Sequence, residues 1–547
     1  MLKHLTLFTA MFLFVAASSF AQTIPQWQWA ASGLASHERY TMDITTDRWD
    51  NVYITGSFDD TLTFPGDTLI SRGDKDIYWA KFSPSGQFLW AASAGGIYDD
   101  EGTGIATDNY GNVYVASYFN DTAFYGIDTV KTKGQSDIVL AKYDNSGNRL
   151  WLKTWGSIYP DQGVKIAIDK HGKIFLTGTF AADGGSPPSH GTITFDNFNI
   201  TSTGGGDIFL VKLDTNATII WGTHAGGVFG DDAGNITLDS MGYIYVTGSF
   251  DAPWADFVNK RINAKFGPFN DMFVAQYDST GYPVWVKGAG SLYPTGGSGV
   301  AVDGQGNVFV AGGCAARLPI KFENNLILDS TRGFVAKYDF TGNLVWAQRV
   351  DVWSNGWLSD VVTDPEDNIY TIGFFSIGFT FNGDTIAPNY DDLFVNKYDN
   401  NGTPLWTKEP MGPGSRGAVI TLNNAGDVLV GGISIPGGPI FGPSTLPDSS
   451  AVLVAKLGSS LTASHLSASQ ADINIYPNPA DNKLYISFNA EAPVHLKLHD
   501  LLGRTLTSEK ITSDQPVIDI SAVPPGLYYL QISGCNYNVC KKLIIQH

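Results

Sequence analysis

The chain contains few cysteine and histidine residues, which are common in disulfide-rich proteins and in metalloenzymes. Its 547 residues include three cysteines and nine histidines. Three cysteines are too few for disulfides to be the main support of a fold this large. The histidines are scattered, and the region before residue 459 has no His-x-x-x-His pair, so a zinc site is not indicated there. No Gly-x-Ser-x-Gly motif or phosphate-binding glycine loop stands between a strand and a helix.

Basic residues and long apolar runs are also scarce. The 34 Lys and Arg residues face 53 Asp and Glu residues, which gives a formal net charge of -19. Without a basic stripe, such a surface repels phosphate backbones, so nucleic acid is excluded as a partner. The apolar run Leu5–Ala17 follows Lys3 and precedes Ser19-Phe20-Ala21. It is too short to span a bilayer, and residues 1–21 are predicted to be a secretory signal peptide. No transmembrane segment is predicted in the mature chain.

What the chain has instead is a repeat marked by tryptophan. The intervals between successive copies are 61, 61, 70, 64, 61 and 60 residues. The seven copies are Trp29, Trp90, Trp151, Trp221, Trp285, Trp346 and Trp406. A fixed period of this length indicates a β-propeller in which each copy is one blade.

Each copy reads as four short antiparallel strands. One copy contains Gly104-Ile-Ala-Thr-Asp108, then Val113–Phe119, then Asp137–Tyr143, and ends before Trp151. β-branched and aromatic runs separated by Asp, Asn and Gly turns are typical of strands. The small side chains of the first run suit the crowded innermost strand, so the tryptophan strand is predicted to be outermost and to pack between blades.

The ends of the repeat predict how the ring closes. The last copy, Arg416–Leu457, supplies only three strands, whereas the tryptophan strand Gln26–Ala31 precedes the first copy. We expect these two segments to pair and to complete the seventh blade, which removes two exposed sheet edges. Residues 22–458 are therefore predicted to form a seven-bladed propeller, and the fold class is all-β.

The composition changes after the propeller. Residues 459–471 are rich in Ser, Ala and Thr without an apolar period, as expected for a linker. Residues 472–547 then contain six or seven short alternating runs, which predict a small β-sandwich. Cys535 and Cys540 flank Asn-Tyr-Asn-Val, and the sequence leaves open whether they form a disulfide.

Four ordered motifs give the tail a specific resemblance. They are Ile475-Tyr-Pro-Asn-Pro479, Leu498-His-Asp-Leu-Leu-Gly-Arg504, Pro525-Gly-Leu-Tyr-Tyr529 and Lys541-Lys-Leu-Ile-Ile545. The segment resembles the type A C-terminal sorting domains of the type IX secretion system of Bacteroidota. The resemblance implies an Ig-like sandwich, export through the periplasm to the outer-membrane surface or the medium, and a translocon and a sortase-like peptidase as partners. The implied sorting residues are Tyr476, Pro477, Asn478, Pro479, Gly503, Arg504, Gly526 and Tyr528.

The repeat region resembles the bacterial β-propeller repeat family of surface and secreted proteins, known as SBBP-type repeats. Gly299-Val-Ala-Val-Asp303, Gly306–Val310 and Phe334–Asp339 carry the pattern. The resemblance describes an architecture and assigns no activity.

Acidic residues mark the loops that follow three of the tryptophans. These loops contain Asp99-Asp100-Glu101, Asp161 and Asp231-Asp232. Paired carboxylates could hydrolyse glycosides or bind calcium, and Asp100, Asp161 and Asp231 are the candidate metal ligands. The alternative is a solvated acidic rim, which the acidic composition favours. No cofactor is predicted, with calcium the one left open.

Two copies carry long insertions, at Asp183–Phe195 and Asp251–Asp271. The second brings aromatic residues without a place in the repeat: Trp254, Phe257, Phe266 and Phe269. Loops on rigid scaffolds often carry recognition, so these are the candidate ligand contacts, unless the rings fold back over their own blade. The sequence favours a secreted or cell-surface, non-catalytic binding or adhesion scaffold. The alternatives are a polysaccharide-acting hydrolase that uses the acidic loops and a purely structural envelope protein.

Overall fold

A computed structural model describes residues 25–458 and 474–546, with gaps at 38, 183–189, 252, 324–325, 353–355, 377, 382, 387–390, 413, 477–479, 488–493, 500–504, 512–516, 522 and 535–536. The predicted signal peptide and linker lie outside the described residues. The chain divides into two compact units, Met1–Ser459 and Ser460–His547. Among the described residues, no helix has the length and hydropathy that a bilayer span requires.

The first unit is a ring of seven four-stranded antiparallel blades. From the innermost strand outward, blade 1 consists of β2 (Arg39–Thr46), β3 (Val52–Phe58), β6 (Asp76–Phe82) and β7 (Phe88–Ala94). Blade 2 consists of β8 (Glu101–Thr107), β9 (Val113–Tyr125), β10 (Asp128–Tyr143) and β11 (Arg149–Trp155). Blade 3 consists of β12 (Gln162–Ile168), β13 (Ile174–Phe180), β16 (Asp207–Leu213) and β17 (Ile219–Gly226). Blade 4 consists of β18 (Asp231–Leu238), β19 (Ile244–Phe250), β22 (Asp271–Tyr277) and β23 (Pro283–Ala289). Blade 5 consists of β24 (Thr295–Val302), β25 (Val308–Lys321), β26 (Ile327–Tyr338) and β27 (Leu344–Val352). Blade 6 consists of β28 (Trp357–Thr363), β29 (Ile369–Phe375), β32 (Asp392–Tyr398) and β33 (Pro404–Lys408).

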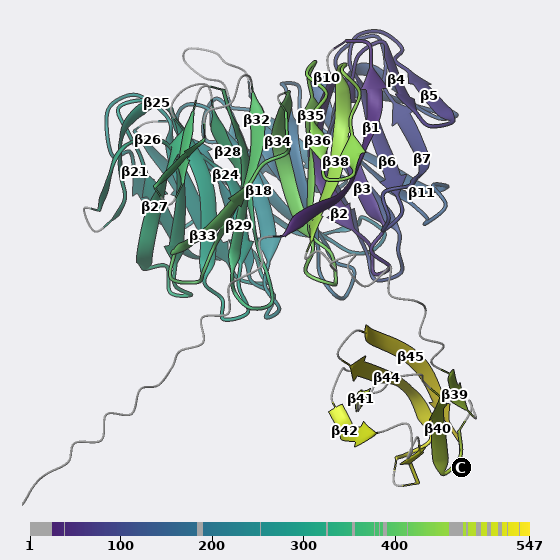
Figure 1. Cartoon of the computed structure of the whole chain (residues 1–547). Coiled ribbons are helices and arrows are strands. Elements are labelled where there is room, and N and C mark those ends of the chain that lie inside the picture. Colours follow the sequence, from purple (N-terminus) through teal and green to yellow (C-terminus); the bar gives the residue numbers. More distant parts are fainter. Residues whose placement is uncertain are drawn as a thin grey trace, which may run out of the picture. The chain divides into compact units, whose positions relative to one another are not determined.

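Blade 7 is built from both ends of the unit. It consists of β34 (Ser415–Leu422), β35 (Val428–Ser434), β38 (Ala451–Gly458) and β1 (Gln26–Ala35). β1 runs antiparallel to β38, with Trp27 opposite Leu457 and Leu34 opposite Ala451. Figure 1 shows the purple β1 beside the yellow-green β38. The predicted seven blades and the predicted closing strand are confirmed.

A second set of contacts joins every blade to the one before it. The link between the second and third strand of each blade forms a hairpin that pairs with the outer strand of the preceding blade. The separate hairpins are β4–β5 (Thr61–Phe64 and Asp67–Ile70), β14–β15 (Thr192–Phe195 and Phe198–Thr201), β20–β21 (Trp254–Phe257 and Lys260–Asn263), β30–β31 (Phe379–Phe381 and Asp384–Ile386) and β36–β37 (Ile440–Phe441 and Ser444–Thr445); in blades 2 and 5 the strands themselves extend. Each hairpin therefore covers part of an outer edge that would otherwise expose unpaired backbone groups.

The repeated tryptophans join the blades at the opposite end. The Nε1 atom of Trp221 donates to the backbone oxygen of Ser279, in the next blade, at 3.0 Å. Its ring lies against Gly281, where a Cβ would approach within 2.7 Å of the indole. Trp29, Trp285 and Trp346 make the same hydrogen bond to the following blade. The predicted packing role is confirmed.

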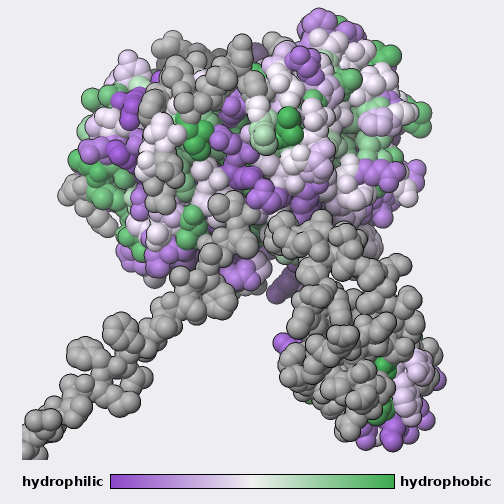
Figure 2. Space-filling model, in the orientation of Figure 1, coloured by the Kyte–Doolittle hydropathy of each residue, from purple (hydrophilic) through white to green (hydrophobic). Residues whose placement is uncertain are grey.

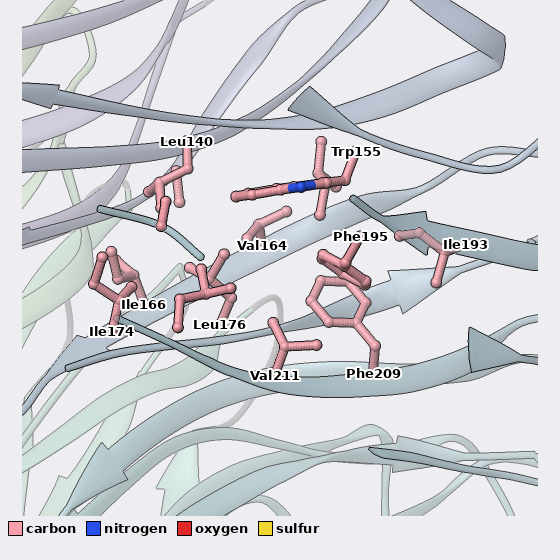
Figure 3. Packing of buried hydrophobic residues seen from close by; sticks show 14 of the residues in the cluster. Leu140, Trp155, Val164, Ile166, Ile174, Leu176, Ile193, Phe195, Phe209 and Val211 are labelled. Carbon is pink, nitrogen blue, oxygen red and sulfur yellow. The ribbon is translucent and has the colours of Figure 1, made fainter. Parts of the chain in front are cut away.

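Apolar side chains fill the space between blades. Figure 3 shows the layer between blades 2 and 3, where Trp155 lies between Leu140 and Phe195. Trp155 and Phe195 have ring centroids 5.5 Å apart, and both are fully buried. Successive residues of each strand point to opposite sides of the blade, so each pair of neighbouring blades encloses its own apolar layer.

The second unit has two sheets. One is β39 (Asn474–Tyr476), β40 (Lys483–Ser487) and β43 (Val517–Asp519); the other is β42 (Thr505–Ile511), β41 (Val494–His499), β44 (Gly526–Gly534) and β45 (Tyr537–Ile545), in the order β42-β41-β44-β45. Both contribute to one core, which includes Leu484, Leu498 and Leu530. Cys535 lies outside the described residues, and Cys540 stands opposite Gln531 in β45.

Candidate functional site

The propeller has two unlike ends, which follow from its up-and-down strand order. The turns between the first and second strand and between the third and fourth strand lie at one end, here called the turn face. The hairpins and the loops that lead from one blade to the next lie at the other end, here called the loop face. The two faces carry different residue types.

The turn face consists of hairpin turns closed by carboxylates. In one such turn Asp47 Oδ1 accepts hydrogen bonds from the backbone of Trp49 and Asn51, and its Oδ2 accepts from Tyr53. Asp108, Asp239, Asp303 and Asp364 accept the same backbone pair. An Asp side chain that accepts from the backbone two and four residues on stabilises a tight turn. These carboxylates are structural.

The loop face exposes an aliphatic and an aromatic residue at four successive blade junctions. The pairs are Ile97-Tyr98, Ile158-Tyr159, Val228-Phe229 and Leu292-Tyr293. Tyr98 is 48% exposed, Phe229 44% and Tyr293 49%, while Tyr159 is half-buried. On the side of the propeller drawn in Figure 2, hydrophobic residues form small patches between hydrophilic ones. An exposed apolar pair therefore recurs at each of these junctions around one face.

A groove lies beside one of these pairs. It is lined by Phe229, Asp251, Pro253, Gly267 and Pro268, and its volume is about 440 Å³. Here it is called the blade-4 groove, because most of its lining comes from the insertion of blade 4. Next to Pro268, the ring of Phe269 stacks on Tyr293 at 5.4 Å. The insertion of blade 4 therefore reaches the junction with blade 5.

The four predicted ligand contacts fall in different environments. Phe257 is fully buried and packs 5.1 Å from Phe273, because the fold places its ring in the apolar layer between blades 3 and 4. Trp254 is half-buried, with the guanidinium of Arg261 3.9 Å over its ring. Phe266 is half-buried beside Lys321, and Phe269 is 39% exposed. Trp254 and Phe269 are the sequence neighbours of the groove residues Pro253 and Pro268.

The acidic candidates Asp100, Asp161 and Asp231 are fully buried. Each accepts backbone hydrogen bonds from the residue four positions earlier and the residue twenty positions later. Each thereby fastens a blade-to-blade loop to the following blade. Burial raises the pKa of Asp100 and of Asp161 to about 7, against backbone hydrogen bonds that lower it. The three stand at three separate junctions, and the described residues hold no group of three His, Cys, Asp or Glu side chains able to bind a metal ion.

A polar constellation that the sequence patterns did not predict lies in the central channel. The channel cavity has a volume of about 300 Å³ and is lined by residues of six inner strands. Asp43 Oδ2 accepts from the backbone of Ile105 at 2.8 Å, and Asp360 Oδ1 accepts from Asn235 Nδ2 at 3.2 Å. Lys165 Nζ donates to the backbone oxygen of Met42 at 2.8 Å. These three hydrogen bonds join residues of blades 1, 2, 3, 4 and 6 around the channel.

The two channel carboxyls have raised pKa values. Burial raises the pKa of Asp360 to about 7, opposed by hydrogen bonds from Val361 and Ile420 and reinforced by the negative charge of Asp43. Burial also raises the pKa of Asp43, and Lys165 lowers it. The repeat offered a signal for this site. The signal is the position four residues before the Asp or Asn that closes the first turn of each copy, because its residue type varies from copy to copy. In the seven copies this position holds Asp43, Gly104, Lys165, Asn235, Gly299, Asp360 and Val419.

The described sorting residues lie on the second unit. Tyr476 is exposed and stacks on Tyr485 at 5.9 Å. Tyr528 is buried, and its hydroxyl donates to the backbone oxygen of Pro524 at 2.7 Å. Gly526 begins β44 and is exposed. Pro477, Asn478, Pro479, Gly503 and Arg504 lie outside the described residues.

Comparison with known proteins finds distant relatives of this chain and a family match for its tail. An uncharacterized WD repeat-containing protein of Acanthamoeba polyphaga mimivirus is 23% identical over 360 residues, which is 53% of this chain and 25% of that protein. This chain thus spans about a quarter of that relative's length. The crystal structure of Sqt1 from Chaetomium thermophilum aligns with 80% of this chain and 100% of its own at 10% identity and a TM-score of 0.38. The extracellular domain of the two-component system BT4673 from B. thetaiotaomicron aligns with 93% of this chain and 81% of its own at 10% identity and a TM-score of 0.21.

The tail has a family match of its own. Residues 474–546 match the family described as "Secretion system C-terminal sorting domain", over the segment that forms the second unit. Such a tail directs a protein through the periplasm to the outer-membrane surface or the medium. The chain is a seven-bladed β-propeller that ends in a C-terminal sorting domain of the type IX secretion system.

Proposed function

We propose that this protein is an exported, non-catalytic binding propeller that uses its loop face to hold carbohydrate chains outside the cell. The observation that supports the proposal is the row of exposed aliphatic–aromatic pairs beside the blade-4 groove. Aromatic faces take up the apolar faces of sugar rings. Carboxylates nearby, such as Asp251 in the groove, accept hydrogen bonds from sugar hydroxyls.

The location of these residues fits a binding role better than catalysis. A glycosidase needs two carboxyl groups that flank a bound substrate. Asp100, Asp161 and Asp231 are buried and already accept backbone hydrogen bonds. The exposed pairs that recur around the loop face are aliphatic and aromatic. A hydrolase that uses these three carboxylates would have to open the blade junctions first.

A glycan array with the purified protein tests the proposal. Tyr293→Ala and Trp254→Ala should each weaken binding by roughly 1 kcal/mol or more, because aromatic contacts carry much of the energy of such sites. Tyr110→Ala is the matched control, since Tyr110 is 81% exposed on the turn face. Binding that tolerates both loop-face variants, or that fails with Tyr110→Ala, would contradict the proposal. Trp254→Ala with lost stability and intact binding would assign Trp254 to packing alone.

The sorting domain adds two partners to the proposal. We infer that the second unit is recognised by the outer-membrane translocon of the type IX system, and that a sortase-like peptidase then removes the tail. Cross-linking from position 476, whose tyrosine is exposed, should capture a component of the export machinery in cells that secrete the protein. Capture that is unchanged in cells without the type IX system would contradict the inference.

A further inference from the structure

The central channel carries more negative than positive charge. Asp43, Asp232 and Asp360 all line it, and Lys165 is the one basic residue among its lining residues. Asp232 is exposed and is the second residue of β18, at the loop face. Asp43 and Asp360 stand further along their inner strands, beside the bulges of β2 and β28. Carboxylates along one narrow channel focus a negative potential that attracts cations.

The arrangement does not suit a bare metal ion. No three carboxylates among the described residues come close enough to coordinate one. Asp43 and Asp360 each accept backbone hydrogen bonds from the next blade, which fixes them on different sides of the channel. A molecule that carries its positive charge on one group and other donors elsewhere can reach these separated acceptors. A calcium or magnesium ion needs convergent oxygens.

The walls supply neutral polar groups and one aromatic ring. Trp357 lines the channel, and its Nε1 donates to Ser298 Oγ at 2.9 Å, which fixes the indole. Ser249 and Ser359 add hydroxyl groups to the lining. Gly234, Gly296 and Gly297 leave backbone exposed to the cavity. An aromatic ring with hydroxyl groups and amides around it is suited to a compact molecule that has several hydroxyl groups.

We propose that the central channel is a second binding site, separate from the loop-face groove, which takes a small polyhydroxylated ammonium compound of the amino-sugar class. The ammonium group lies near the exposed carboxylate of Asp232, and the hydroxyl groups face Ser298, Ser359 and Asn235. A volume of about 300 Å³ is at the lower end of the range for small-molecule pockets. One monosaccharide therefore fits the channel better than an oligosaccharide.

Calorimetric titration with two matched probes tests the site. Glucosamine carries the ammonium group, and N-acetylglucosamine is its neutral counterpart. We expect glucosamine to bind and N-acetylglucosamine to bind at least tenfold more weakly. Equal binding of the two probes, or no binding of glucosamine at millimolar concentration, would overturn the proposal.

Variants of opposite charge sign locate the site. Asp232→Asn should weaken glucosamine binding about tenfold, and Lys165→Met should strengthen it. The matched control is Asp196→Asn, which removes one negative charge from the exposed turn of β14–β15 at a positive φ that Asn tolerates. Melting curves identify any variant that fails to fold, and Asp232→Asn is safe in this respect because its side chain is exposed.

Two further results distinguish binding in the channel from binding elsewhere on the protein. Equal loss in Asp196→Asn and Asp232→Asn would show general attraction to an acidic surface and would overturn the channel site. Tyr293→Ala should leave glucosamine binding unchanged, since Tyr293 belongs to the loop-face surface. Loss of glucosamine binding in Tyr293→Ala would place the probe on the loop face and refute the separate site.

Discussion

Asp207 and Asp231 border the same glycine at the junction of blades 3 and 4. A Cβ on Gly226 would lie 2.4 Å from Oδ1 of Asp207 and 2.8 Å from Oδ2 of Asp231. Asp76 and Asp100 border Gly95 in the same way, with distances of 2.3 and 3.0 Å. At the junction between these two, Gly156 contacts Asp137, whose charge raises the pKa of Asp161. Three successive blade junctions thus enclose a pair of carboxyl groups.

These pairs predict that the propeller is more stable in mild acid than at alkaline pH. Burial raises the pKa of Asp76, Asp100 and Asp161 to about 7 and those of Asp137 and Asp207 to about 6. The folded protein therefore binds more protons than the unfolded chain between about pH 4 and pH 7. The free energy of unfolding falls as the pH rises through this window.

The turn carboxylates act in the opposite direction at lower pH. Hydrogen bonds lower the pKa of Asp144. In four further turns burial raises the pKa of the carboxyl group, but the hydrogen bonds outweigh it and the pKa is lowered: Asp108, Asp214, Asp278 and Asp339. Their stabilisation is lost as the pH falls below the value of about 4 for the unfolded chain. The melting temperature should have a maximum near pH 5 and be several degrees lower at pH 8. A melting temperature that rises steadily from pH 5 to pH 8 would contradict the assignment.

The two members of a carboxyl pair should respond differently to amide substitution. Both oxygens of Asp231 accept backbone N–H groups, whereas Oδ1 of Asp207 is buried without a donor among the described residues. On this hydrogen-bond geometry we expect the proton of the pair to be carried by Asp207, although burial raises the pKa of both carboxyl groups. Asp207→Asn supplies a permanent donor and should raise the melting temperature at pH 8. Asp231→Asn turns an amide NH₂ toward a backbone N–H and should cost about 2 kcal/mol. Equal effects of the two variants at pH 8 would argue against this proton position.

Substitution of two glycines distinguishes the contribution of tryptophan packing from the cost of backbone strain in a turn. Gly281 has φ +84° and lies against Trp221, whereas Gly242 has φ +93° and open space, with nothing within 4 Å of the point that a Cβ would occupy. Gly242→Ala should cost only the left-handed backbone penalty of roughly 1–2 kcal/mol. Gly281→Ala should cost distinctly more, because the methyl group displaces the indole from its hydrogen bond to Ser279. Chemical denaturation measures both, and equal costs would mean that the tryptophan contributes little to blade docking.

The closing strand should depend on its first tryptophan. Trp27 is 5% exposed, its Nε1 donates to the backbone oxygen of Glu409 at 3.0 Å, and its ring lies 4.8 Å from Phe441. Trp27→Ala should destabilise the propeller by about 3–5 kcal/mol. Tyr110→Ala serves as the control, with an expected change within about 0.5 kcal/mol. A small loss for Trp27→Ala would show that β1 holds blade 7 through backbone pairing alone.

Export should require the second unit. Deletion of residues 472–547 should leave a folded propeller in the periplasm, because the two units have separate cores. Fractionation with limited proteolysis reports both the location and the folded state. Secretion of the truncated protein at the normal level would refute the sorting role of the tail.

The repeat made the fold predictable because its marker residues have physical roles in every copy. Trp221 needs an outer strand and a glycine turn in the next blade, and Asp47 needs a tight turn. Such requirements recur with the period of the blade. The pairing of β1 with β38 was predictable from counting strands, since an unpaired edge at each end leaves one solution.

The site was less predictable because carboxylates look alike in sequence. Asp100 and Asp232 both stand in loop-face acidic runs, yet Asp100 is buried and Asp232 is exposed. The glycines beside Asp100, Gly95 and Gly96, are visible in the sequence. Their neighbours Asp76 and Thr122 belong to two different blades, so the sequence alone does not show that these glycines enclose Asp100. Tyr98 is exposed because the loop turns inward at the carboxylate of Asp100 and leaves the preceding aromatic residue outside. Asp43, Lys165 and Asp360 line one cavity only because the ring brings three distant copies to one axis.

The closing strand also sets the order in which the molecule can become complete. The hydrogen bond from Trp27 to Glu409 spans 382 residues of chain. β1 also pairs with β38, the final strand of the propeller in the sequence. Contacts of such separation form slowly, because a long loop must close before they contribute. Blades 1 to 6 can assemble from local hairpins, while blade 7 waits for both ends. The finished ring then resists opening, since separating either end breaks a whole strand pairing at once.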